Sequence, residues 1–140
     1  MEMSPQSASK QEGLRLLQAG AVDDAIAVLE NVLESNPDDA ETHTYLGAAY
    51  NQKDDKLHAV HHFEESVRLQ ETPRSYYNLG LVYEASHRID EAVRQYRMAA
   101  ELDPNYVLAQ QALKRLHDRF EAEHQGGQDE TGAFGQPPAP

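Results

Sequence analysis

The sequence contains no cysteine and no tryptophan. Without cysteine, the chain forms no disulfide and offers no thiolate for catalysis or metal binding. Basic residues are also scarce, because 12 Lys and Arg stand against 24 Asp and Glu and leave a net charge of -12. Nucleic acids and anionic membrane surfaces are bound through clustered basic residues, so we expect neither of them as a partner.

Long apolar stretches are absent as well. No run approaches the roughly 20 apolar residues that a membrane-spanning helix needs. The first residues, MEMSPQSASKQEG, lack the basic start and the apolar run of a secretory signal. We therefore expect a cytoplasmic protein. With 140 residues, of which 39% are hydrophobic, the chain is large enough for one domain with a core.

Signatures of catalysis are missing too. The sequence has no glycine-rich phosphate loop, no nucleophile elbow and no His-Glu-x-x-His string. Its many carboxylates are explained by helix starts, where they offset the partial positive charge of the helix end, and by solvation. We therefore expect neither an enzyme nor a bound cofactor.

What the sequence does contain is an internal repeat. Gly13, Gly47 and Gly80 are separated by 34 and then by 33 residues. Further columns repeat with the same two spacings, which indicates a stack of similar units. These columns are Leu16, Tyr50 and Tyr83; Ala25, Ala59 and Ala92; and Leu29, Phe63 and Tyr96. The alignment places the one missing residue in the second unit, near residues 70–73.

Each unit reads as two helices, and the glycines fall inside the first of them. Glycine costs roughly 1 kcal/mol relative to alanine there, so close approach of the paired helix is expected to offset that cost. We expect the alanine column, Ala25, Ala59 and Ala92, to lie opposite the glycines, with the two large columns meeting each other.

The repeated pattern resembles the tetratricopeptide repeat over about residues 6–104. The residues that carry the resemblance are Leu46, Gly47, Tyr50, Ala59 and Phe63, then Leu79, Gly80, Tyr83, Ala92, Tyr96, Ala99 and Pro104. The resemblance implies an all-α, right-handed superhelical solenoid of helix-turn-helix repeats. A seventh helix follows, and Lys114 stands in it where the repeats have glycine, which is typical of a polar capping helix.

The expected organisation is therefore three repeats and a C-terminal capping helix, seven helices in all. We expect the repeats at residues 6–39, 40–72 and 73–106, and the capping helix at 107–125. Residues 1–5 are expected to be disordered, and so is the Gly- and Pro-rich tail at 126–140.

The resemblance also implies that the first helix of each repeat lines a concave groove. Helical geometry then exposes a set of side chains to that groove. These are Lys10, Leu14, Thr44, Tyr45, Ala48, Arg74, Tyr77, Asn78 and Leu81, with Gln111 and Arg115 from the capping helix. Exposed tyrosines in adjacent repeats favour binding over mere solvation. We therefore expect a protein-interaction module, a scaffold or assembly adaptor, that binds a peptide or helix of a partner protein.

The alternative is a non-catalytic module for self-association, or one arm of a larger assembly, and we expect a monomer or a weak homo-oligomer. Acids on the second helices, such as Glu30, Glu34 and Glu64, predict an acidic convex side, and the groove is expected to be near neutral.

Relatives that hold the C-terminal carboxylate of heat-shock chaperones use lysines, asparagines and an arginine. Lys10 and Arg74 match two of these positions, whereas Leu14, Tyr45 and Asn78 do not. We therefore expect weak or no binding of such chaperone tails.

Two histidine clusters are candidates for metal sites. His58 and His62 lie one helical turn apart, and His117, Glu121 and His124 share a helix face. A zinc site needs three or four arranged ligands, and neither cluster fixes a complete set. We expect no metal, with the histidines of the second repeat on a solvated convex face.

Overall fold

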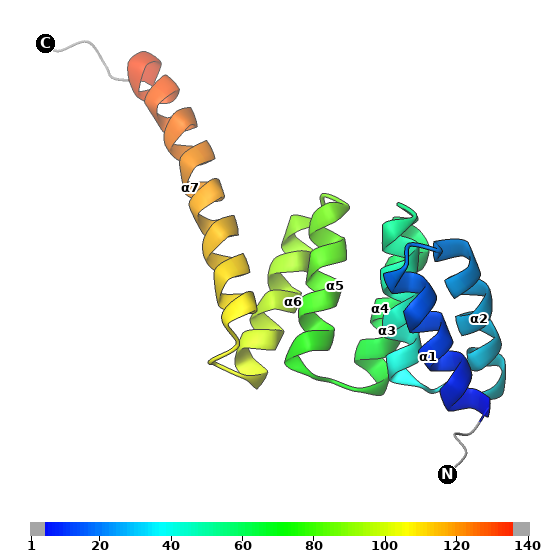
Figure 1. Cartoon of the computed structure of the whole chain (residues 1–140). Helices are drawn as coiled ribbons and strands as arrows, with labels where there is room; N and C mark the ends of the chain where they lie inside the picture. The colour runs from blue at the N-terminus through cyan, green and yellow to red at the C-terminus, as the bar shows by residue number, and fades with distance from the viewer. Residues whose placement is uncertain (1–4, 136–140) are drawn as a thin grey trace, which may run out of the picture.

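The computed structural model describes the backbone of residues 5–135 and the side chains of residues 9–125. Within that range the chain is entirely helical apart from short connections, and it forms seven helices (Figure 1). They are α1 (Pro5–Gln18), α2 (Val22–Ser35), α3 (Ala40–Gln52), α4 (Lys56–Leu69), α5 (Pro73–Ala85), α6 (Ile89–Leu102) and α7 (Val107–Gly135). The expected number of helices and the all-α class are confirmed for the described residues.

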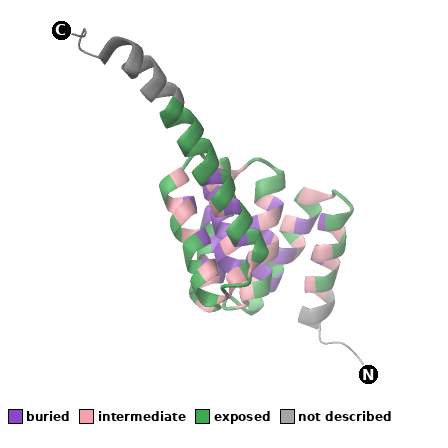
Figure 2. Ribbon diagram, turned by 90° about the vertical axis from the view of Figure 1, so that its left-hand side faces the viewer, coloured by how far each residue is buried: buried purple, intermediate pink, exposed green. Residues whose placement is uncertain are grey.

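The first six helices form three pairs, α1 with α2, α3 with α4 and α5 with α6, and the pairs stack side by side (Figure 1). α7 begins against α6 and then leads away from the stack. Buried residues lie on the inner faces between the pairs, while most residues of the described part of α7, residues 107–125, are exposed (Figure 2). The fold is thus an α-helical solenoid whose core is a series of interfaces between neighbouring helices.

The mid-helix glycines do not face the alanine column, so that expectation was wrong. A Cβ on Gly47 would lie 2.8 Å from the ring of Phe63, and one on Gly80 would lie 2.5 Å from Tyr96 Cε1. Gly13 meets Leu29 in the same way. Each glycine therefore makes room for the large side chain of the paired helix, because that side chain packs directly against the glycine backbone.

The turn inside each repeat contains one residue with a positive φ angle. It is Gly20 in the first repeat (φ 83°), Asp54 in the second (φ 62°) and His87 in the third (φ 61°). The residue after each of them donates its backbone N–H to a carbonyl in the last turn of the first helix, at 2.8–2.9 Å. This closure ends the helix and reverses the chain, but only the first repeat uses the residue best suited to the left-handed conformation.

The connection between α4 and α5 is one residue shorter than the other two between repeats. It consists of residues 70–72, against residues 36–39 and 103–106. Thr72 caps α5 by accepting the N–H of Ser75 at 3.0 Å, and Ser75 Oγ accepts the N–H of Thr72 at 2.9 Å. Proline at the first position of α5 needs no hydrogen-bond partner for a backbone N–H. The deletion inferred from the repeat spacing lies at this junction.

The expected ends of the chain differ from those of the structure. α1 begins at Pro5, one residue before the expected start of the first repeat. α7 continues to Gly135, so residues 126–135 are helical rather than a disordered tail. α7 continues through Gly126 and Gly127, since extension of an existing helix avoids the cost of nucleation, although each glycine costs roughly 1 kcal/mol relative to alanine. Residues 136–140 of the expected tail and residues 1–4 lie outside the described residues.

Candidate functional site

A hollow of about 200 Å³ lies between α3 and α5 and brings four of the expected groove residues together. These are Thr44 and Tyr45 on α3 and Arg74 and Asn78 on α5. The rest of the lining comes from the first turn of α3, the end of α4 and the start of α5: Ala40, Glu41, Ser66, Gln70, Thr72 and Ser75. The lining is rich in side chains that donate hydrogen bonds.

A second hollow, of about 230 Å³, continues the first along the same two helices. Ala48 and Leu81, two more of the expected residues, line it together with Phe63 and Val82. Asn78 lines both hollows. The two therefore form one furrow, which we call the α3–α5 furrow, with a polar half near the start of α5 and a more apolar half near its end.

Arg74 is the one basic residue of the expected groove without an ion pair in the part of the chain that the structure describes. Lys10 Nζ lies 3.0 Å from Asp39 Oδ2 and 3.3 Å from Glu41 Oε1. Burial opposes the charge of Lys10, but these two carboxylates raise its pKa. Arg115 reaches Glu84 on α5, where its guanidinium nitrogen donates to Glu84 Oε1 at 3.1 Å. Of these three bases, Arg74 alone keeps a positive charge without an acidic partner among the described residues.

The remaining expected residues lie outside the furrow. The ring of Tyr77 packs against two other rings. Its centroid lies 5.7 Å from that of Tyr96 and 5.9 Å from that of Tyr106. Leu14 is half-buried on α1 and Gln111 is exposed on α7, and neither lines the two hollows. The expected set thus divides into six residues on the furrow, two bases held by acids, and three residues elsewhere.

Sequence reasoning missed a buried pair of histidines. His43 on α3 and His62 on α4 are each 6% exposed, and their Nδ1 atoms lie 3.1 Å apart. His43 Nε2 lies 2.9 Å from the carbonyl oxygen of Pro37, which only accepts, so His43 carries its proton on Nε2. His43 Nδ1 then accepts the hydrogen bond that His62 Nδ1 donates. The expectation that His62 lies on a solvated face was wrong, because this hydrogen bond satisfies it inside the stack.

Further groups surround this pair. The ring of Tyr50 stacks on that of His62, with centroids 5.5 Å apart, and Glu30 Oε1 lies 4.0 Å from His62 Nε2. Burial, followed by the charges of His43 and of His61 and His58, lowers the pKa of His62 to about 4. The sequence signal that could have found His62 is the 3.6-residue helical period. It places His62 on the same face of α4 as the buried Ala59 and Phe63.

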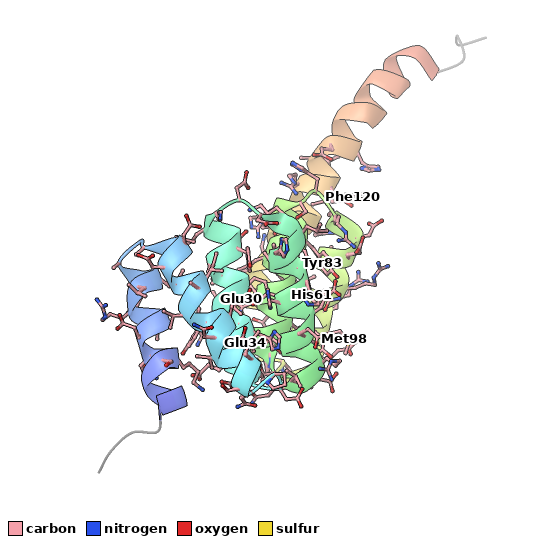
Figure 3. The ribbon with its side chains drawn as sticks, turned by 90° about the vertical axis from the view of Figure 1, so that its right-hand side faces the viewer. Glu30, Glu34, His61, Tyr83, Met98 and Phe120 are labelled. Carbon is pink, nitrogen blue, oxygen red and sulfur yellow. The ribbon has the colours of Figure 1, made fainter. Side chains whose placement is uncertain are left out.

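Two acids of the second helices reach the next repeat. Figure 3 shows Glu30 and Glu34 on α2 and His61 on α4. Glu30 accepts a hydrogen bond from Tyr50, and Glu64 accepts one from Tyr83. Among the described residues, no group of three or more His, Asp or Glu side chains is arranged to hold a metal ion. None of the described helices is both long and apolar enough to span a membrane.

Curated relatives match parts of the chain. A protein O-mannosyl-transferase of Caenorhabditis elegans is 29% identical over 87 residues, which are 61% of this chain and 13% of that protein. Superkiller complex protein 3 of Mus musculus is 33% identical over 98 residues, 66% of this chain and 6% of that protein. The chain therefore spans only a small part of the length of these relatives.

Solved structures share the fold. The first TPR domain of Spaghetti (RPAP3), bound to the HSP90 peptide SRMEEVD, matches with a TM-score of 0.77 at 21% identity, covering 83% of this chain and 93% of that one. MamA matches with a TM-score of 0.75 at 24% identity, covering 93% of this chain and 74% of that one.

Two family models match the sequence itself. A tetratricopeptide repeat model matches residues 73–106, and a TPR repeat model matches residues 13–54. Both lie where the structure has stacked helix pairs. The chain belongs to the tetratricopeptide repeat family.

Proposed function

We propose that the α3–α5 furrow binds a peptide or helix of a partner protein, and that the chain acts as a non-catalytic scaffold or assembly adaptor. The observation that carries this proposal is the meeting of the two hollows at Asn78. A bound segment would find the unpaired Arg74 and the Tyr45 ring in one half, and Ala48 and Leu81 in the other. Tyrosine and arginine are enriched among the residues that dominate binding energy.

The solved domain of Spaghetti supports the same class of function. That domain is bound to a peptide of a partner protein, and its fold matches this chain. At 21% identity the likeness concerns the fold, so the chemistry of the furrow decides what this chain binds. The furrow offers one free base and an apolar half, which suits a segment with an acceptor-rich portion followed by an apolar side chain.

Site-directed variants test the proposal in affinity purifications from the native source. Arg74→Ala and Asn78→Ala are expected to lose partner proteins that the unchanged chain recovers. Met98→Ala is the matched control, because Met98 is exposed on α6 and lies outside the furrow. Circular dichroism checks that all three variants keep their helical content. Full recovery of the same partners by the Arg74→Ala, Asn78→Ala double variant would refute the furrow as the binding site.

Tyr77 is a poor choice for such a test. Its ring packs against Tyr96 and Tyr106, so its removal would loosen the third repeat and weaken binding for structural reasons. Tyr45 is the better aromatic position, because it lines the hollow and is half-buried.

A further inference from the structure

Three tyrosines lie near Arg74 or near one another: Tyr45 on α3, Tyr77 on α5 and Tyr106 in the connection before α7. Tyr45 lines the first hollow together with Arg74. Tyr106, in the connection before α7, lies against Tyr77, with ring centroids 5.9 Å apart. Burial raises the pKa of Tyr45 and of Tyr106, and the nearby charge of Arg74 opposes the rise in both. Arg74 therefore lies near both rings, and we call Tyr45, Arg74, Tyr77 and Tyr106 the tyrosine–arginine surface.

This surface offers flat rings and hydrogen-bond donors. Arg74 presents guanidinium N–H groups, Asn78 an amide and Thr44 a hydroxyl. Glu41, the one carboxylate in the lining, is already paired with Lys10. A well-matched ligand therefore carries carbonyl acceptors and apolar rings and has few N–H groups of its own. Proline-containing segments have this chemistry, because proline keeps its carbonyl and lacks the N–H.

Such a segment exists in this chain, and we propose that residues 136–140 of one copy, Gln-Pro-Pro-Ala-Pro, dock on the tyrosine–arginine surface of a second copy. This inference rests on the proposed function, because it assigns an occupant to the same side of the molecule. Proline-rich segments favour the polyproline II form, with three residues per turn. In that bound form Pro137 and Pro140 would share the edge that meets the tyrosine rings, and Pro138 would lie on another edge.

The reach of the chain requires a second copy. α7 starts directly after Tyr106 and has 29 residues, so it carries residue 135 about 43 Å along its axis. Figure 1 shows α7 leading away from the stacked pairs. Five further residues extend at most about 18 Å, which is too short to return to Tyr106. The segment of one molecule therefore reaches the surface only of another.

Contacts of this kind join two different patches, a tail on one copy and a surface on the next. A head-to-tail interface leaves a free tail and a free surface at the ends, so association continues into open chains or rings. A small interface of this sort gives weak binding, with a dissociation constant between micromolar and millimolar. Self-association should therefore rise steadily with concentration, without stopping at a dimer.

Two complementary variants of the chain test the proposal. Analytical ultracentrifugation measures their association at concentrations from micromolar to millimolar. One variant lacks residues 136–140, and the other keeps them but carries Tyr45→Ala and Arg74→Glu. Each alone is expected to stay monomeric, and an equimolar mixture is expected to form a dimer and nothing larger. Pro137→Ala with Pro140→Ala should weaken association at least about tenfold, and Pro138→Ala should change it less.

Three results would overturn the inference: self-association that survives removal of residues 136–140, an unchanged chain that remains monomeric at millimolar concentration, or a mixture that stays monomeric. Circular dichroism establishes that each variant is folded. The failure of this inference is distinguishable from failure of the proposed function, because the chain without residues 136–140 should still recover its partner proteins. If Arg74→Ala keeps those partners while the mixture still dimerises, the proposed function fails and the self-association stands.

Discussion

Tyr83 on α5 donates a hydrogen bond from its hydroxyl to Glu64 on α4 at 2.9 Å, and so ties the third repeat to the second. An equivalent hydrogen bond ties the second repeat to the first, where the hydroxyl of Tyr50 donates to Glu30 at 3.0 Å. One repeat further on, Arg97 and His117 occupy the equivalent positions. The joint between α6 and α7 therefore lacks this bond, which agrees with the departure of α7 from the stack (Figure 1).

Removal of one hydroxyl tests the value of this bond. Tyr83→Phe is expected to lower the free energy of unfolding by about 1 kcal/mol, because the acceptor is a charged but exposed carboxylate. Tyr77→Phe is the matched control, since the Tyr77 hydroxyl makes no hydrogen bond within the described residues. Urea unfolding measures both. Equal losses in the two variants would mean that the bond between repeats contributes nothing.

The contact between Gly80 and Tyr96 predicts that the effect of Gly80→Ala on stability changes sign when the Tyr96 ring is removed. Gly80→Ala puts a Cβ about 2.5 Å from the ring of the fully buried Tyr96, so the variant is expected to lose about 1–3 kcal/mol of stability. In a Tyr96→Ala background the same change should instead gain about 1 kcal/mol, because alanine is the better helix former. A double-mutant cycle from denaturant unfolding gives both values. Additive effects would show that the ring does not need the glycine.

The positive φ angle of His87 predicts a stabilising substitution. A non-glycine residue in the left-handed region carries a cost of about 1–2 kcal/mol, which glycine avoids at some expense of entropy in the unfolded chain. His87→Gly is therefore expected to raise the free energy of unfolding by about 0.5–1 kcal/mol. His87→Ala keeps a Cβ in the same conformation and should bring no gain. Thermal unfolding distinguishes the two, and a destabilised His87→Gly would contradict the prediction.

The repeat spacing was sufficient to predict the number of helices, their pairing and the short connection near Pro73, because recurring side chains report recurring interfaces. It did not reveal what faces each glycine, since Leu29, Phe63 and Tyr96 reach across from the paired helix and their paths depend on its tilt. It also missed the pairing of His43 on α3 with His62 on α4, two residues 19 positions apart in the sequence. Six of the eleven expected groove residues line the α3–α5 furrow.

The other five expected residues do not line the furrow. Helical geometry gives the direction of a side chain but does not say which residue of another helix it meets. Lys10 pairs with Asp39 and Glu41 at the start of α3, and Arg115 pairs with Glu84 on α5. Periodicity within one helix contains no information on which acid of the next helix comes within reach.

Weak or no binding of chaperone tails stays a prediction, and the structure adds a reason to expect it. Of the two matching bases, Lys10 is held by Asp39 and Glu41, so its charge is already balanced. Calorimetry with the peptide SRMEEVD is expected to detect weak or no binding. A variant carrying Leu14→Asn, Tyr45→Asn and Asn78→Lys, which supplies the missing residue types, should bind more tightly. A micromolar or tighter complex of the unchanged chain would contradict this prediction.

The buried histidine pair makes stability depend on pH. Folding lowers the pKa of His62 from 6.5 to about 4. Between pH 4 and pH 6.5 the ring of His62 is therefore protonated in the unfolded chain and neutral in the folded chain. The stability is therefore complete above pH 6.5 and is lost as pH falls toward 4, by about 1.4 kcal/mol per pH unit. The groups that face His62 are His43 and Tyr50 on α3, Glu30 on α2, and His58, His61 and Glu65 on α4.

Urea unfolding at pH 7 and pH 5 measures this loss. His62→Gln removes the titrating ring and is expected to show a smaller drop in stability between the two pH values, by about 2 kcal/mol. His117→Gln is the control, because His117 is exposed on α7 and is not among the groups that shift the pKa of His62, so its variant should keep the full drop. The comparison isolates the buried ring, since carboxylates that titrate below pH 5 contribute equally to all three chains. An identical pH dependence in His62→Gln and the unchanged chain would mean that His62 takes up its proton without leaving the fold.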